Sequence, residues 1–227
     1  MGGVIIVLLI VGAIAYFWLA KDSANVRKLY KDRTPEQKDA IRYFLSDGCL
    51  SKTMSDSQYD EMVRRKVDSL NLRKKAIDKI GLDEDEIKEI EPVNLEGYRY
   101  EKAYQKYGKD KQWRSSKYEV TWIFASDKQL YVYSYMFNTD EDGKRERTEE
   151  YFWKDITNFS TITETKEVGV EWDKKKGEYK SRKNIDEQDF GITVPGEKYI
   201  CAAEVSESVE RAIQAMKAKL REKKNVQ

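Results

Sequence analysis

The first twenty residues are the most apolar stretch of the chain and carry no charged side chain. A helix over residues 2–20 would span about 28 Å at about 1.5 Å per residue, which matches the roughly 30 Å hydrocarbon core of a bilayer. Tyr16, Phe17 and Trp18 cluster at its C-terminal end, where amphipathic rings favour the membrane interface. This pattern predicts a transmembrane helix over residues 1–20.

The flanks of this segment predict how the chain is oriented. Residues 21–33 form a basic juxtamembrane linker with five bases against two acids. By the positive-inside rule, this bias predicts a single-pass protein of the cell membrane, with the N-terminus outside and residues 21–227 in the cytoplasm. A cleaved signal peptide is the alternative. It is disfavoured because Trp18 stands where cleavage requires a small residue.

The pattern of residues 34–92 predicts a small helical segment. Thr34, Pro35 and Gln37 provide a capping residue, a proline at the first helical position and a capping-box partner. Three runs of apolar residues then recur at helical spacing, which predicts three short helices before Pro92. Their apolar positions are Ile41, Phe44 and Leu45, then Tyr59, Met62, Val63, Val67 and Leu70, then Ala76, Ile77 and Ile80.

From residue 95 onward the apolar period changes from 3.6 to 2, which is typical of strands. Seven strands are predicted, over residues 96–103, 118–125, 131–137, 148–153, 159–171, 189–194 and 198–204. A final helix is expected after Ser206, because Ser206 is a good capping residue and apolar residues follow at helical spacing. Its apolar stripe is Val209, Ile213, Met216 and Leu220.

This order of elements resembles the bacterial PH-like and GRAM-like domains. The resemblance covers residues 95–224 and includes the segment YFWKDITNF at residues 151–159, a strand followed by an Asp-Ile turn. It implies an α+β fold, in which a PH-like seven-stranded β-barrel or sandwich over residues 94–227 is capped by the C-terminal helix. The transmembrane helix and the helical segment would precede this domain. A small SH3-like barrel with an added helix is the alternative.

Composition narrows the possible functions. The chain has 42 basic and 41 acidic residues, so it lacks the strongly basic balance expected of a nucleic-acid-binding protein. It has no histidine, which removes the commonest general base, the serine triad and most catalytic zinc sites. Cys49 and Cys201 are far apart and neither belongs to a CxxC pair, so Cys201 is expected to be a buried structural thiol. We therefore expect no catalytic residues, no cofactor and no metal.

One acidic segment partly fits a calcium-binding loop. Asn138, Asp140, Asp142, Gly143 and Glu149 fall at positions 1, 3, 5, 6 and 12 of the EF-hand pattern. The flanking segments alternate like strands, however, whereas an EF-hand requires helices. Asp-Gly between two alternating runs is a hairpin signal, so a hairpin turn is the preferred interpretation.

A basic loop provides the candidate binding residues. Residues 102–117 contain six bases and one acid, and in PH domains the loop between the first two strands binds anionic lipid headgroups. The resemblance therefore implies an anion-binding role for Lys109, Lys111, Arg114 and Lys117. The phosphoinositide signature of the family, a base two residues before an arginine on the second strand, is missing. A solvated loop is the alternative.

The sequence as a whole predicts a single-pass, membrane-anchored scaffold or binding module without catalysis. Its expected partners are the anionic lipids of the cytoplasmic leaflet or another protein, and not nucleic acid. An accessory subunit of a membrane complex, docking through residues 34–92, is one alternative. A carboxylate- or metal-dependent enzyme is another, because acids are the only abundant catalytic side chains.

Overall fold

The computed structural model describes residues 6, 24–45, 53–82, 90–173, 176–204 and 206–225. Within these ranges, the chain after residue 23 begins with the helices α2 (Ala24–Leu29), α3 (Pro35–Leu45), α4 (Asp56–Leu70) and α5 (Leu72–Ile80). Capping boxes begin two of them, because the side chains of Thr34 and Ser55 accept hydrogen bonds from the amides of Gln37 and Gln58. The three helices predicted within residues 34–92 are present as α3, α4 and α5, whereas α2 lies in the predicted linker and the first strand already begins at Ile90.

The strands that follow form three antiparallel sheets. The first has the order β1 (Ile90–Arg99), β4 (Lys117–Ala125), β5 (Gln129–Asn138) and β6 (Lys144–Phe152). The second pairs β2 (Gln105–Tyr107) with β3 (Trp113–Ser115), and the third has the order β7 (Asn158–Asp173), β8 (Glu178–Val194) and β9 (Glu197–Ala202). The chain then forms α6 (Glu207–Asn225).

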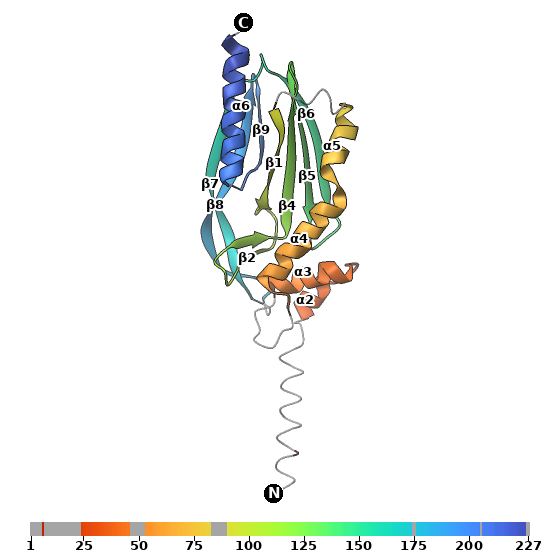
Figure 1. Ribbon diagram of the computed structural model, residues 1–227. Coiled ribbons are helices and arrows are strands. Elements are labelled where there is room, and N and C mark those ends of the chain that lie inside the picture. The colour runs from red at the N-terminus through yellow and green to blue at the C-terminus, as the bar shows by residue number, and fades with distance from the viewer. Residues whose placement is uncertain are drawn as a thin grey trace.

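The central strands of the four-stranded sheet, β4 and β5, are buried on both faces, and the sheet lies between two other layers (Figure 1). Alternate side chains of β4 show how this arises. Val120 and Phe124 pack into the core shared with α3, α4 and α5, whereas Ile123 and Ala125 pack into the core shared with β7, β8, β9 and α6. Burial on both faces explains why aromatic and aliphatic residues occupy six of the nine positions of this strand.

The C-terminal helix is confirmed. Ser206 caps α6 by accepting a hydrogen bond from the Val209 amide at 3.3 Å. Ile213, Met216 and Leu220 of its apolar stripe are buried in the second core, and Val209 is partly buried against it. The period of 3.6 in the sequence therefore identified the face that packs on the sheets.

The predicted fold class is wrong in its sheet architecture. The described residues are mostly β-sheet and form nine strands in three sheets, instead of seven strands in one barrel or sandwich. The predicted strand over residues 96–103 stops at Arg99, because the chain turns with Lys102 at a φ of 51° and then forms the β2–β3 hairpin. The predicted strand over residues 189–194 is the end of a strand of 17 residues.

The predicted transmembrane helix and single-pass membrane localisation are also corrected. In the described parts of the chain, no helix is both long and apolar enough to cross a membrane. The longest of them, α6, has 19 residues, but its apolar stripe is narrow and charged residues are frequent on the rest of the helix. The predicted span over residues 1–20 lies outside the described residues, apart from Ile6.

A buried ion cluster joins the two larger sheets. Arg99 on β1 donates from Nε to Glu119 of β4 at 2.7 Å and from Nη1 to Asp189 of β8 at 2.5 Å. Glu187 of β8 lies 3.5 Å from the same Nη1 atom. The side chains of these three acids are only 6–8% exposed, so one guanidinium holds three carboxylates between the sheets.

The β7–β8 hairpin is the longest element of the fold. Its strands pair from Asn158 and Thr193 to Asp173 and Glu178, and Gly177 with a φ of 75° helps to form the turn. The turn end of the β7–β8 hairpin reaches the β2–β3 hairpin, where the Tyr179 hydroxyl accepts a hydrogen bond from the Gln105 amide at 2.9 Å.

Candidate functional site

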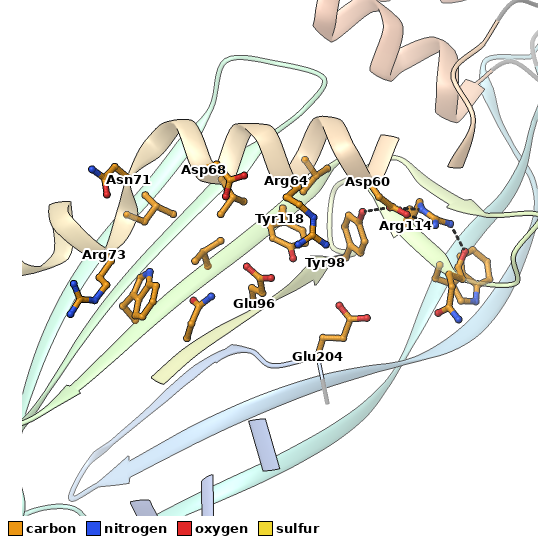
Figure 2. A pocket seen from close by; sticks show the side chains of 18 residues that line it. Asp60, Arg64, Asp68, Asn71, Arg73, Glu96, Tyr98, Arg114, Tyr118 and Glu204 are labelled. Carbon is orange, nitrogen blue, oxygen red and sulfur yellow. Dashed lines mark hydrogen bonds and ion pairs between the residues drawn. The ribbon is translucent and has the colours of Figure 1, made fainter. Parts of the chain in front are cut away.

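A cavity of about 590 Å³ lies between α4 and the first two strands of the four-stranded sheet (Figure 2). We call it the α4–β1 groove. Its volume is within the range of about 300–1,000 Å³ typical of ligand pockets. Eighteen residues line it: Asp60, Val63, Arg64, Val67, Asp68, Asn71, Leu72, Arg73, Asn94, Glu96, Tyr98, Gln112, Trp113, Arg114, Tyr118, Val120, Trp122 and Glu204.

The local structure of each element explains which side chains reach the groove. On α4, Asp60, Arg64 and Asp68 are spaced four residues apart, so they share one face of the helix. On β1, Asn94, Glu96 and Tyr98 alternate with residues of the second core, so they share the face that looks toward α4. Charged side chains therefore form both walls.

The floor of the groove is aromatic and aliphatic. Tyr118, Val120 and Trp122 of β4 lie opposite Tyr98, Glu96 and Asn94 of β1 in the register of the sheet. The Trp122 ring stacks on Phe124 with 6.1 Å between centroids and 19° between planes, which fixes the orientation of the indole. Tyr118 and Val120 are only 8% and 1% exposed, whereas Trp122 is half-buried, so a ligand in the groove would contact mainly the indole between two polar walls.

The β2–β3 hairpin closes one end of the groove through Arg114. The Arg114 side chain is only 4% exposed and forms paired hydrogen bonds to Asp60 of α4, both at 2.6 Å. It also bonds Asp110 of its own hairpin, from Nη1 at 2.9 Å and from Nη2 at 2.5 Å. The Tyr98 hydroxyl donates to Asp60 at 3.1 Å, as the dashed line in Figure 2 shows. These contacts fix α4 against the sheet.

The tip of the hairpin docks on the start of α4. The Lys109 amide donates to Asp56 at 2.7 Å, and the Tyr43 hydroxyl donates to the other oxygen of that carboxylate at 2.9 Å. The Gly108 backbone is enclosed by side chains: an added Cβ would clash first with Asp110 and Arg114 of the same hairpin and would lie 3.0 Å from Cγ of Asp56. A glycine therefore leaves room for the Asp110–Arg114 ion pair and for the contact with the helix.

Glu96 is the most perturbed acid in the groove. Burial raises the pKa of its carboxyl, whereas the Arg64 guanidinium lowers it. Hydrogen bonds from Asn94 and Tyr118 also lower this pKa, and the Glu204 carboxylate raises it. Glu204 lies near Glu96 because its backbone amide donates to the Glu96 carbonyl oxygen at 2.9 Å. The β1 side of the groove therefore carries two neighbouring acids.

The predicted anion-binding residues do not form one site. Arg114 is turned inward and paired with two acids, so its charge is already neutralised. Lys117 donates through Nζ to the Glu101 carbonyl oxygen at 2.9 Å, on another side of the hairpin. Lys109 and Lys111 are exposed at the hairpin tip. Anion binding by these residues stays a prediction. The pairing of Arg114 reduces the positive charge of the loop on which that prediction was based.

The acidic segment that partly fits an EF-hand is a hairpin turn, as the preferred interpretation had it. The Asn138 amide donates to the Gly143 carbonyl at 3.2 Å, and Asp142 accepts a hydrogen bond from Gln37 of α3 at 2.7 Å. In the described residues, no group of three or more His, Cys, Asp or Glu side chains could hold a metal ion. The acids of this turn instead anchor it to the helices.

Cys201 is fully buried in the second core, as expected. Burial raises the pKa of its thiol far above the usual range, so the thiol is protonated and unreactive at neutral pH. Cys49 lies outside the described residues.

Sequence reasoning missed the α4–β1 groove. Two local signals were present, the four-residue spacing of charges on α4 and the period-two alternation of Asn94, Glu96 and Tyr98. Neither shows that the helix and strand face each other.

No family model, curated protein or solved structure matches the chain in sequence or structure comparisons.

Proposed function

We propose that this protein is a non-catalytic binding module and that the α4–β1 groove holds an extended segment of a protein partner. The observation that carries this proposal is the groove itself, an open cavity with an aromatic floor, charged walls and one closed end. Such a mixture of apolar surface and a few placed polar groups is typical of recognition sites.

The dimensions of the groove support a peptide ligand. From Asp60 to Asn71 the helical wall is about 16 Å long, at about 1.5 Å per residue. From Asn94 to Tyr98 the opposite wall is about 13 Å long, at about 3.3 Å per residue. An extended segment of four or five residues fits this length.

A hydrolytic enzyme is the competing function, because Glu96 and Glu204 lie on one wall of the groove. A carboxylate pair acts as general acid and base when its two members flank the bond that breaks. These two acids instead stand beside each other on the β1 side, and the helical wall opposite them bears Arg64 (Figure 2). This arrangement suits holding a ligand more than cleaving it.

The test uses the tryptophans of the chain as reporters. The full-length protein is labelled with 5-fluorotryptophan, and each ¹⁹F resonance is assigned with a Trp→Phe variant. Trp113 and Trp122 line the groove, whereas Trp153 and Trp172 lie elsewhere. The probes are four pentapeptides, acetyl-Ala-Leu-Xaa-Leu-Ala-amide, in which the central residue is arginine, citrulline, glutamate or tryptophan.

We expect at least one pentapeptide to shift the Trp113 or Trp122 resonance saturably without shifting those of Trp153 and Trp172. Asn94→Phe should abolish this shift, because Asn94 is exposed and a ring there fills the groove. Thr148→Phe places the same ring on the exposed face of β6 and is the matched control. If no probe shifts a groove resonance, or if Asn94→Phe changes nothing, the proposed function is wrong.

A further inference from the structure

We infer that the α4–β1 groove selects a partner segment presenting an arginine, whose guanidinium is held by Glu96 and Glu204 and whose stem lies on the aromatic floor. This inference rests on the proposed function and specifies the chemistry of the ligand. The observation that supports it is the arrangement of charges along the two walls of the groove.

The charges of the groove are not evenly distributed. Asp60 and Arg114 neutralise each other at the closed end. In the remainder, the helical side contributes Arg64, Arg73 and Asp68, whereas Glu96 and Glu204 are the charged side chains on the β1 side. Figure 2 shows both glutamates beside the cavity, below Arg64. A cationic ligand group is attracted to this side.

The two glutamates come from segments that the fold brings together. Glu96 is in the middle of β1, and Glu204 follows β9 and is tied to the Glu96 backbone by the hydrogen bond at 2.9 Å. Gly97 permits this approach, because an added Cβ there would lie 3.3 Å from the Ala202 side chain and 3.6 Å from the Glu204 amide. The backbone geometry therefore holds the pair of acids in place.

The environment of Glu96 favours a cation over a neutral group. Its carboxylate is partly desolvated, and a buried charge is costly unless it is paired. Arg64 and the Tyr118 hydroxyl satisfy part of this requirement. A ligand cation would place a further positive charge beside Glu96 and would relieve its repulsion with Glu204.

The floor favours arginine over lysine. The rings of Tyr98, Tyr118 and Trp122 line the groove beside the two acids. A guanidinium stacks on aromatic faces and presents a planar set of donors that can bond two carboxylates, whereas an ammonium is compact and strongly hydrated. Arginine therefore uses both the floor and the acidic wall.

The ¹⁹F titration distinguishes this inference from the proposed function. The arginine pentapeptide should bind at least tenfold more tightly than the citrulline pentapeptide, which has nearly the same shape and no charge. Glu204→Gln should reduce this ratio to about one. Glu61→Gln removes an acid from an exposed position of α4 outside the groove and should leave the ratio unchanged.

Failure of this inference and failure of the proposed function give different results in the titration. If the arginine and citrulline pentapeptides bind equally at Trp122, the groove binds peptides but does not select a cation, and this inference is wrong. The same conclusion follows if the glutamate pentapeptide binds best, or if Glu204→Gln keeps the preference for arginine. If no pentapeptide shifts a groove resonance, the proposed function fails together with the inference.

Discussion

Replacement of Arg99 by methionine should destabilise the protein more than most single substitutions. Methionine keeps the length of the side chain and its apolar stem but removes the guanidinium. Glu119, Glu187 and Asp189 would then remain between the sheets with side chains 6–8% exposed. The perturbation therefore leaves three buried carboxylates without the cation that they share.

The magnitude follows from the contacts that are lost. Arg99 makes close charge-assisted hydrogen bonds to two of the acids, at 2.7 Å to Glu119 and at 2.5 Å to Asp189. Such bonds contribute about 1.5–3 kcal/mol each. Breaking a buried ion pair by removing one partner costs about 3–5 kcal/mol. We expect a loss of about 3–5 kcal/mol, a large part of the roughly 5–15 kcal/mol typical of native proteins.

Acidification should reduce this loss. Burial already raises the pKa values of Glu187 and Asp189 in the wild-type protein, although Arg99 opposes that rise. An acid whose pKa is higher in the folded state costs stability when ionised, and this cost falls as the pH drops through the folded pKa. Without Arg99 the pKa values rise further, so the loss should be largest at pH 7 and smaller near pH 4.5.

Urea unfolding at pH 7 and pH 4.5, followed by tryptophan fluorescence, measures both effects. The triple variant Arg99→Met, Glu119→Gln, Asp189→Asn is the matched control, because it removes two of the stranded charges and should recover part of the stability. A loss below about 1 kcal/mol at pH 7, where buried ion pairs typically cost about 3–5 kcal/mol to break, would refute the reasoning. Equal losses at the two pH values would also refute it.

Three further substitutions test other parts of the structure. Gly108→Ala should cost about 1–3 kcal/mol of unfolding free energy, because an added methyl group would clash with Asp110 and Arg114 and crowd Asp56. Wild-type stability in urea unfolding would contradict the close packing at Gly108. Glu96→Gln should raise the urea midpoint at pH 7 and have little effect near pH 3.5. Burial raises the pKa of Glu96 despite the opposing effects of Arg64, Asn94 and Tyr118, and Glu204 adds to the rise, so the ionised carboxylate costs stability. A lower midpoint at pH 7 would argue against this account. Ile213→Asp should lower the unfolding free energy by about 3–5 kcal/mol, because it buries an unpaired charge. Gln214→Asp at the exposed neighbouring position should lower it by less than about 1 kcal/mol. Calorimetric unfolding of the two variants measures this difference.

Local patterns in the sequence predicted the elements whose signal lies within one segment. The C-terminal helix was predicted because Ile213, Met216 and Leu220 repeat at helical spacing. The β4–β5 hairpin was predicted because apolar residues alternate on both sides of Ser126. In the helix, the side chains that define the pattern are the ones that the fold buries. In the hairpin, the residues between them, such as Ile123 and Val132, are buried as well.

The errors have two different causes. Most of β8 was missed because its residues 178–184 are almost all exposed and charged or polar, so they show no apolar alternation. The predicted transmembrane helix relied on local signals alone: the apolar length, the aromatic cluster at its end and the basic flank. The structure supplies no spanning helix in the residues that it describes.

The candidate site depends on contacts between distant segments. Asp60 meets Tyr98 and Arg114 across 38 and 54 positions of the sequence. Arg114 was interpreted as a free base in a basic loop, because its pairing with Asp110 four positions earlier was not recognised and its second partner, Asp60, lies in the distant helix α4. Charge in one segment therefore predicts a binding site only after the ion pairs within the fold are known.

The β7–β8 hairpin can pair without help from distant segments. Its pairing can grow outward from the turn at Gly177, and Trp172 and Tyr179 meet beside this turn with 5.1 Å between ring centroids. Only a short loop must close for this to begin, whereas pairing of Arg99 in β1 with Lys117 in β4 closes a longer loop that contains the β2–β3 hairpin. The β7–β8 hairpin is therefore suited to form before β1 joins its sheet. Its amides should be protected from exchange earlier during refolding than those of β1, which bears one wall of the α4–β1 groove.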